Sequence, residues 1–232
     1  MVLIAVSAIA PKAWLQEAPP PPAIDSQGPI EVVEKGEANL EAGKQLYQRV
    51  CSQCHGPGGE GSIALKAPSI ANLPAWYVTG QIEKFQKDWR GSTPNDAPGI
   101  MMHAIASSLD PAAVRDVAEH IRSLRLIPTV VTLAGGDPAN GAELFRERCM
   151  ECHRYNGRGE PAFRSAQLIG LQDWYIVSQL KKFRDGIRGS HESDTEGAKM
   201  HRVSGPLSDE SFRDLAAHIA DLAQKYTEEP RR

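Results

Sequence analysis

The feature that most constrains this chain is a cysteine-containing segment that occurs twice. "CSQCHGPGGEG" spans Cys51 to Gly61, and "CMECHRYNGRG" begins at Cys149, 98 residues later. At the same offset, pairs of identical residues occur along almost the whole of one half of the chain, and no insertion or deletion is needed to align them. We therefore infer a tandem duplication of one unit. The paired positions include Gly43 and Gly141, Trp76 and Trp174, Tyr77 and Tyr175, Phe85 and Phe183, Arg90 and Arg188, Met102 and Met200, and His120 and His218.

The duplication sets the expected domain organisation. A chain of 232 residues is long enough for two domains of about 100 residues each. We predict one domain at 39–128, a linker at 129–136 and a second domain at 137–232. The hydrophobic fraction is only 41%, and small domains with modest apolar content often depend on a disulfide, a metal or another bound group.

Residues 1–38 are expected to form a separate segment. The start, "MVLIAVSAIA", is apolar, but it is shorter than the roughly 20 residues of a spanning helix and lacks the basic beginning of a secretory signal. We interpret it as the end of a truncated signal peptide or membrane anchor; a disordered hydrophobic start is the alternative. The four consecutive prolines that follow favour an extended linker that tethers the folded part to a membrane.

Each unit is expected to be helical, because apolar residues recur at helical spacing and strand-like alternation is absent. We predict three helices per unit, separated by long loops. The first begins after the N-cap residue Asn39 or Asp137, and the last begins at Asp110 or Ser208. The middle helix carries an apolar stripe in each unit, formed by Val78, Ile82, Phe85 and Trp89, and by Ile176, Leu180, Phe183 and Ile187.

The cysteine pairs allow several chemistries, and most of them fit poorly. A disulfide across two intervening residues closes a very small loop and removes little chain entropy. In a zinc site the second cysteine pair usually follows the first within about 20 residues of sequence. The sequence separation between Cys54 and Cys149 is much larger. A thioredoxin-like pair belongs to a βαβ context, which a helical chain lacks. None of these sites requires a histidine in both copies.

Covalent haem attachment uses all three residues of the Cys-x-x-Cys-His motif. Two thiols add to the vinyl groups of the porphyrin, and the adjacent imidazole ligates the iron. The chain has this motif twice, so we predict two haem c groups, each with a histidine ligand. The residues are Cys51, Cys54 and His55 in the first unit, and Cys149, Cys152 and His153 in the second.

The second axial ligand is predicted from the duplication. Met102 and Met200 are paired by the offset, and each follows its proximal histidine by 47 residues. We expect both to lie in loops before the last helix, where a methionine is not needed to fill a core. Met101 is the alternative to Met102, but it pairs with Lys199. His103 and His201 are alternatives that would give bis-histidine iron, and a polar role near the haem edge or the interface is expected for them instead.

The duplicated set resembles the dihaem class I cytochromes c, most closely the c4 type, over about residues 39–226. The resemblance rests on the Gly-x-x-Leu-aromatic helix before each motif, on "WYVTGQIEKFQKDWRG" and "WYIVSQLKKFRDGIRG", and on the methionine segments before "VRDVAEHI" and "FRDLAAHI". It implies an all-α fold of two tandem class I cytochrome c domains, each a few helices wrapped around a covalently bound haem. It also implies that Gly43 and Gly141 allow the first and last helices to cross closely.

Two departures from that family stand out. His120 and His218 occupy positions where the family often has an aromatic residue, so the helix crossing is expected to pack differently. The family also tends to have a proline whose carbonyl accepts a hydrogen bond from the proximal imidazole. Pro68 fits this pattern, but the second unit has Ala166, and this puts the contact to His153 in doubt.

These features predict an electron carrier rather than an enzyme. The resemblance implies a periplasmic electron carrier, and we expect a cytochrome bc complex or a dehydrogenase as its donor and a terminal oxidase as its acceptor. One alternative is a tethered cytochrome subunit of a membrane oxidase or dehydrogenase complex. Another is a dihaem enzyme such as a peroxidase or a thiosulfate-oxidising cytochrome. With 26 basic and 29 acidic residues, the chain shows no bias towards binding nucleic acid.

Overall fold

The structure is a computed structural model that describes residues 37–226. The expected signal or anchor segment and almost all of the proline-rich linker that follows it lie outside the described residues. Within 37–226, no helix has the length and apolar character needed to cross a membrane. Secondary structure other than helix is limited there to two isolated antiparallel bridges, which join Ser62 to Ala67 and Glu160 to Ser165.

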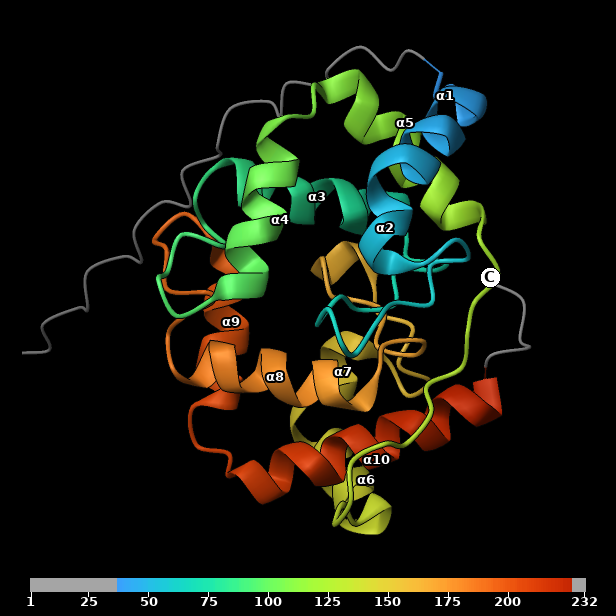
Figure 1. The fold of residues 1–232 in the computed structure, drawn as a ribbon. Coiled ribbons are helices and arrows are strands. Elements are labelled where there is room, and N and C mark those ends of the chain that lie inside the picture. The colour runs from blue at the N-terminus through green and yellow to red at the C-terminus, as the bar shows by residue number, and fades with distance from the viewer. Residues whose placement is uncertain (1–36, 227–232) are drawn as a thin grey trace, which may run out of the picture. The chain divides into compact units, whose positions relative to one another are not determined.

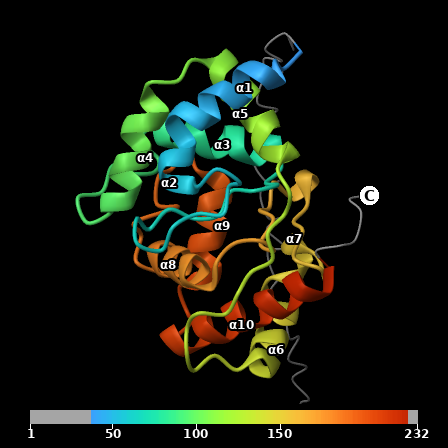
Figure 2. The same cartoon turned by 45° about the vertical axis from the view of Figure 1, so that its right-hand side comes forward.

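Two sets of helices follow one another in the same order, and we call them the first and second lobes. Figures 1 and 2 show α1 to α5 grouped in one lobe and α6 to α10 in the other. The first lobe consists of α1 (Leu40–Leu46), a π-helical turn η1 (Tyr47–Cys51), α2 (Ser52–His55), α3 (Ala75–Gln86), α4 (Ala97–Ser107) and α5 (Pro111–Ser123). The second consists of α6 (Pro138–Arg148), α7 (Met150–His153), the 3-10 turn η2 (Pro161–Phe163), α8 (Asp173–Arg184), α9 (Thr195–Ser204) and α10 (Asp209–Tyr226).

The first helix of each lobe begins where its capping residue predicts. The side chain of Asn39 accepts a hydrogen bond from the amide of Ala42, and that of Asp137 from the amide of Ala139. Each helix then crosses the last helix of its lobe at a glycine, as expected. A Cβ atom on Gly43 would lie 2.1 Å from the carbonyl oxygen of Asp116 in α5, so no larger residue fits the crossing without a shift.

The middle helices α3 and α8 bury the predicted stripe only in part. Val78, Ile82 and Phe85 are buried on α3. Trp89 lies beyond the end of that helix, and Ile187 lies beyond the end of α8. The prediction that these two residues extend the stripe is therefore wrong. Each helix ends before a residue with a positive φ angle, Asp88 at 60° and Gly186 at 70°, and this conformation cannot continue a right-handed helix.

Each lobe contains a further helix, α4 or α9, that the sequence analysis assigned to a loop. Asp96 caps α4 by accepting a hydrogen bond from the amide of Gly99, and Asp194 caps α9 through the amide of Gly197. Both carboxylates are buried. The prediction of three helices per unit was wrong because these caps start a helix in a segment whose glycines do not favour one.

The core is one continuous cluster of buried apolar side chains from both lobes. The last helix of each lobe supplies much of it, with Val117 and Ile121 on α5 and with Phe212, Leu215 and Ile219 on α10. These residues recur at helical spacing, so that each last helix turns one apolar face to the core.

The segment that joins the lobes packs along the second lobe. The Thr129 hydroxyl donates to the carbonyl oxygen of Leu171 at 2.7 Å. The carboxylate of Asp173, at the start of α8, accepts hydrogen bonds from the Thr132 hydroxyl at 2.7 Å and from the amide of Leu133 at 2.7 Å. Asp173 is 1% exposed, so the joining segment covers this end of α8.

Candidate functional site

Each lobe brings two thiols and an imidazole together around one short helix. In the first lobe, Cys51 ends η1, while Cys54 and His55 lie on α2. In the second lobe, the equivalent residues are Cys149, Cys152 and His153, the last two on α7. All four cysteines carry free thiols. Among residues 37–226, no group of three or more His, Cys, Asp or Glu side chains gathers in a metal-binding arrangement.

Both histidines are held in the same way. The Nδ1 atom of His55 lies 2.7 Å from the carbonyl oxygen of Pro68, and that of His153 lies 2.8 Å from the carbonyl oxygen of Ala166. The doubt about the His153 contact was therefore misplaced. The acceptor is a backbone carbonyl, which alanine supplies as well as proline does.

The environment of these histidines favours a neutral ring with one free nitrogen. Burial lowers the pKa of His55 and of His153, although the bond to the backbone carbonyl acts in the opposite direction. When Nδ1 donates its proton to the carbonyl, Nε2 keeps its lone pair, and an imidazole in this form is a metal ligand. The chain thus presents one such nitrogen in each lobe.

The thiols do not have the character of a redox-active pair. Burial raises the pKa of Cys51 to about 11 and, as the main cause, that of Cys149 to about 12. Reactive thiol pairs have lowered pKa values and are partly ionised near neutral pH. Cys51 and Cys149 are protonated there, so the structure gives no support to a thioredoxin-like role.

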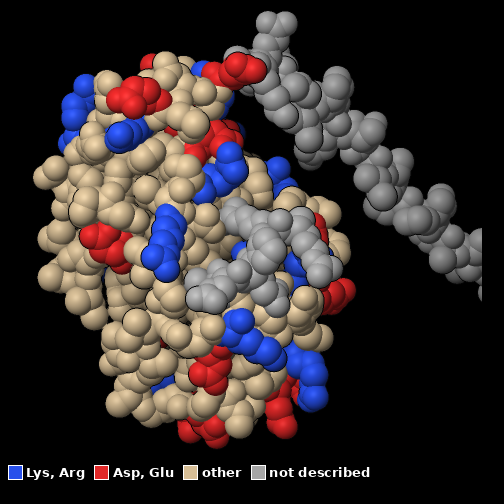
Figure 3. Space-filling model, turned by 90° about the vertical axis from the view of Figure 1, so that its right-hand side faces the viewer, with Lys and Arg blue, Asp and Glu red and all other residues tan. Residues whose placement is uncertain are grey.

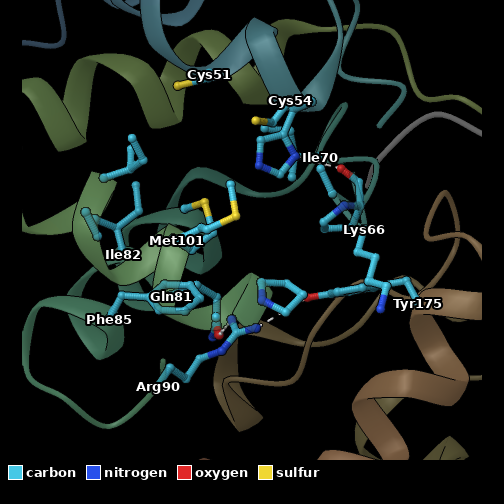
Figure 4. Close-up of a pocket in the computed structure, with 18 of the residues that line it drawn as sticks. Cys51, Cys54, Lys66, Ile70, Gln81, Ile82, Phe85, Arg90, Met101 and Tyr175 are labelled. Atoms are coloured by element: carbon cyan, nitrogen blue, oxygen red, sulfur yellow. Dashed lines mark hydrogen bonds between the residues drawn. The ribbon is translucent and has the colours of Figure 1, made fainter. Parts of the chain in front are cut away.

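A cavity of about 740 Å³ opens beside the first attachment motif. Figure 4 shows Cys51 and Cys54 at one end of it and Arg90 at the other. Its lining also includes His55, Met101 and Met102, and it is mainly apolar. Volumes of this order hold organic ligands and cofactors. The two thiols, the buried imidazole and the two methionine thioethers that border one apolar space fit a covalently attached haem.

The methionines lie on helices rather than in the loops that we expected. Met102 is on α4 and Met200 is on α9. Both are partly buried, and Met102 packs against the core. Met101 is 58% exposed, and its counterpart Lys199 is also exposed. Burial therefore follows the register of the duplication and favours Met102 over Met101.

The remaining histidines have other contacts. The Nδ1 atom of His103 lies 2.7 Å from the carbonyl oxygen of Phe85, and that of His201 lies 2.5 Å from the carbonyl oxygen of Phe183. Each of these rings therefore ties the methionine helix of its lobe to the end of the middle helix. His120 and His218 pack against aromatic rings at the helix crossings, with ring centroids 5.2 Å from Tyr47 and 5.3 Å from Phe145, respectively.

A polar network that the sequence analysis did not identify joins the lobes next to the cavity. Arg90 donates to Gln81 of its own lobe at 2.7 Å and to Gln179 of the other lobe at 3.3 Å. Arg188 donates to Gln179 at 2.8 Å and to Gln81 at 2.8 Å. Arginine and glutamine are both paired by the 98-residue offset. The register is thus the sequence signal that could have found them.

The network places two cations between the lobes, of which Arg188 is buried and Arg90 is partly buried. The guanidinium of Arg90 stacks 4.4 Å from the Phe85 ring, and that of Arg188 stacks 4.4 Å from the Phe183 ring. Burial raises the pKa of the Tyr175 hydroxyl, but the two guanidiniums outweigh it and the net direction is downward. This region is therefore electrostatically suited to a negatively charged group.

The outer surface carries mixed charges. Figure 3 shows lysines and arginines interspersed with acidic residues on the face that it draws. The formal net charge of the whole chain is −3. That face therefore has no broad surface of one sign of the kind that binds nucleic acid.

Comparisons with known proteins agree with this geometry. The family model for cytochrome c matches residues 40–125 and 138–223. The chain is 33% identical to the cbb3-type cytochrome c oxidase subunit FixP of Bradyrhizobium sp. (strain ORS 278), over 65% of this chain and 53% of that subunit. It thus spans only about half the length of that relative.

Two further relatives match most of their own length. The thiosulfate dehydrogenase electron acceptor of Stutzerimonas stutzeri (strain A1501) is 26% identical, over 82% of this chain and 91% of that protein. The crystal structure of reduced cytochrome c4 from Pseudomonas stutzeri superposes with a TM-score of 0.63 at 26% identity, covering 79% of this chain and 98% of that one. The expected all-α fold and the likeness to cytochrome c4 are therefore confirmed.

Proposed function

Because the chain belongs to the cytochrome c family and contains two copies of its domain, we propose that it carries single electrons between redox proteins. Two such domains indicate two covalent haem c groups. We retain the boundaries 39–128 and 137–232 for the domains, with 129–136 as the linker. The proposed attachment residues are Cys51, Cys54, Cys149 and Cys152, and the proposed axial ligands are His55, Met102, His153 and Met200.

One observation carries this proposal, namely that both lobes present the same donor set in the same register. A buried imidazole is fixed through Nδ1 by a backbone carbonyl, at 2.7 Å in the first lobe and 2.8 Å in the second. In each lobe a later helix carries a partly buried methionine. The histidine that follows this methionine ties its helix to the middle helix. If both residues of this set held the haem iron, no open position would remain for a substrate, and this favours electron transfer.

The chain's own residues would set the properties of each centre. Haem iron supplies the one-electron couple when it is bound. The carbonyls of Pro68 and Ala166 orient the imidazoles and increase their basicity as ligands. Met102 and Met200, as thioether ligands used together with histidine, would favour the reduced state and a high potential. At the first centre the apolar cavity lining would limit access of water, and Arg90 and Arg188 supply positive charge between the lobes.

Partners and location are part of the proposal. A cytochrome bc complex or a dehydrogenase would donate the electron, and a terminal oxidase would accept it in the periplasm. Two relatives support this, since one is a cbb3-type oxidase subunit and the other is an electron acceptor of thiosulfate dehydrogenase. A tether in the N-terminal segment would suit either a free carrier held at the membrane or a subunit of a larger complex.

Spectroscopy and a redox titration of the purified holoprotein test this function. We expect two haems per chain, low-spin iron, and the weak near-infrared charge-transfer band of methionine-ligated ferric haem. The titration should resolve one or two one-electron steps at high potential. A high-spin spectrum in the native protein, or turnover of peroxide or thiosulfate without a partner protein, would favour the enzyme alternative.

A further inference from the structure

Two reciprocal ion pairs connect the lobes at the methionine helices. The Nζ atom of Lys84, on α3, lies 2.5 Å from Oδ1 of Asp194 in the second lobe. The Nζ atom of Lys182, on α8, lies 2.5 Å from Oδ1 of Asp96 in the first lobe. Both lysines and both aspartates are paired by the 98-residue offset. Each lobe thus contributes the lysine of one ion pair and the aspartate of the other.

Each aspartate is also the N-cap of the helix that carries a proposed axial methionine. Asp96 Oδ1 accepts a hydrogen bond from the amide of Gly99 at 3.0 Å, and Asp194 Oδ1 accepts one from the amide of Gly197 at 2.9 Å. The carboxylates are packed tightly onto the first turn, since a Cβ atom on Gly99 would lie 2.1 Å from Oδ2 of Asp96. One oxygen in each lobe therefore joins a helix start to a lysine of the other lobe.

Burial makes each aspartate dependent on its lysine. Asp194 is 1% exposed and Asp96 is 6% exposed. A carboxylate removed from water is stable only when it is paired and hydrogen-bonded, and loss of one partner leaves a costly unpaired charge. Asp194 has further charge nearby, because Lys84 also lies 3.6 Å from Glu196, which in turn lies 3.4 Å from Arg164. Asp96 relies on Lys182 without such an extension, since the residue equivalent to Glu196 is Pro98.

The methionine helix is held at two points, and they belong to different lobes. His103 ties α4 to the end of α3 in its own lobe, while Lys182 of the other lobe holds the Asp96 cap. Met102 lies between these points, six residues after Asp96 and next to His103. Met200 has the same position relative to Asp194 and His201. A released cap would therefore loosen the helix turn that precedes the thioether.

We propose that Lys84 and Lys182 are positioning residues that act across the interface, so that each lobe supplies the side chain that fixes the methionine helix of the other. This inference rests on the proposed axial role of Met102 and Met200. It means that methionine ligation in either lobe depends on how the two lobes are docked.

The test uses the holoprotein variants Lys84→Met and Lys182→Met. Lys181→Met is the matched control, because Lys181 is adjacent on α8 and pairs at 2.6 Å with Asp209 of its own lobe. The measurement is the upfield-shifted methyl proton resonance of each haem-bound methionine in the ferrous protein, assigned to its lobe with Met102→Ala and Met200→Ala.

Each lysine variant should disturb the signal of the opposite lobe. We expect Lys84→Met to broaden or abolish the Met200 signal and to leave that of Met102 in place. Lys182→Met should do the reverse, and Lys181→Met should change neither. The inference is overturned if both signals survive in both lysine variants, or if each variant affects its own lobe instead. If the native protein shows no methionine signal, then the proposed axial ligation fails and this inference fails with it.

A rescue variant separates positioning from a general loss of stability. In Lys84→Met/Asp194→Asn the amide oxygen still accepts from Gly197, and no buried charge is left unpaired, so the Met200 signal should return at room temperature. If Lys84→Met does not accumulate as holoprotein, the double variant alone is heated. The Met200 signal should then disappear at a lower temperature than in the native protein, while the Met102 signal should not, and an unchanged profile would reject the inference.

Discussion

The Nδ1 atom of His153 lies 2.8 Å from the carbonyl oxygen of Ala166, at the place where His55 meets Pro68 at 2.7 Å. The two contacts have nearly the same length although the residues that accept them differ. What orients each proximal imidazole is therefore the path of the backbone 13 residues after the histidine, and not the proline ring.

Replacing Pro68 tests this directly. Pro68→Ala should leave the potential and the near-infrared band of the first haem unchanged, because the carbonyl remains in place. It should lower the free energy of unfolding by about 0.4–1 kcal/mol, since the unfolded chain gains freedom. Redox titration and chemical denaturation measure the two effects. A fall in the potential of the first haem alone would mean that the ring itself matters.

The methionine assignment predicts separate losses in the two lobes. Met102→Ala and Met200→Ala should each remove about half of the near-infrared band, because in this assignment each thioether would ligate one iron. Met101→Ala is the control, since Met101 is 58% exposed and should leave the band intact. Loss of the band in Met101→Ala, with retention in Met102→Ala, would transfer the ligand to Met101.

The helix crossing in the first lobe predicts a strong effect of a single methyl group. Gly43→Ala places a Cβ atom 2.1 Å from the carbonyl oxygen of Asp116, and overpacking of this kind costs about 1–3 kcal/mol. Gly80→Ala is the matched control. On α3 its Cβ atom would come no closer than 3.9 Å to Arg164, and it should stabilise the helix by about 0.5–1 kcal/mol. Equal effects of the two substitutions in thermal unfolding would contradict the close crossing.

Stability should depend on pH through His218. Burial lowers the pKa of His218 in the folded protein, so the unfolded chain binds more protons in the window below the ordinary value of about 6.5. The contribution to stability is thus present above that pH and is lost as the pH falls below it.

The variant His218→Phe removes this titration and keeps a ring beside Phe145. Its unfolding temperature should fall less than that of the native protein between about pH 7.5 and pH 5.5, where the histidine charges in the unfolded chain. Calorimetry at these two pH values measures the difference. If the two proteins show the same decrease, His218 is not the group responsible.

Local patterns predicted the elements that depend on local residues. Asn39, Asp137 and Asp110 cap helices as expected, and α3 and α8 keep the 98-residue offset at both ends. The attachment motif predicted where the thiols and imidazoles gather, because its residues are adjacent in the chain.

Other features depend on how the lobes dock, which no periodicity encodes. The helices that carry Met102 and Met200 start at aspartates held by lysines of the opposite lobe, so their sequences alone read as loops. The Arg90 and Arg188 network was missed for the same reason. The network could have been found from polar residues that are identical in both units, such as Gln81 and Gln179.

The buried carboxylate of Asp173 makes the second lobe depend on residues that lie outside the duplicated unit. The family match resumes at residue 138, yet Asp173 is satisfied by Thr132 and Leu133, upstream of that point. Ala75 stands at the equivalent position in the first lobe, so the requirement belongs to one copy only. A second-lobe fragment cut at the repeat boundary would keep the amide of Trp174 as a donor to Asp173 but would lose the donors of Thr132 and Leu133, so the second copy depends on the segment that joins it to the first.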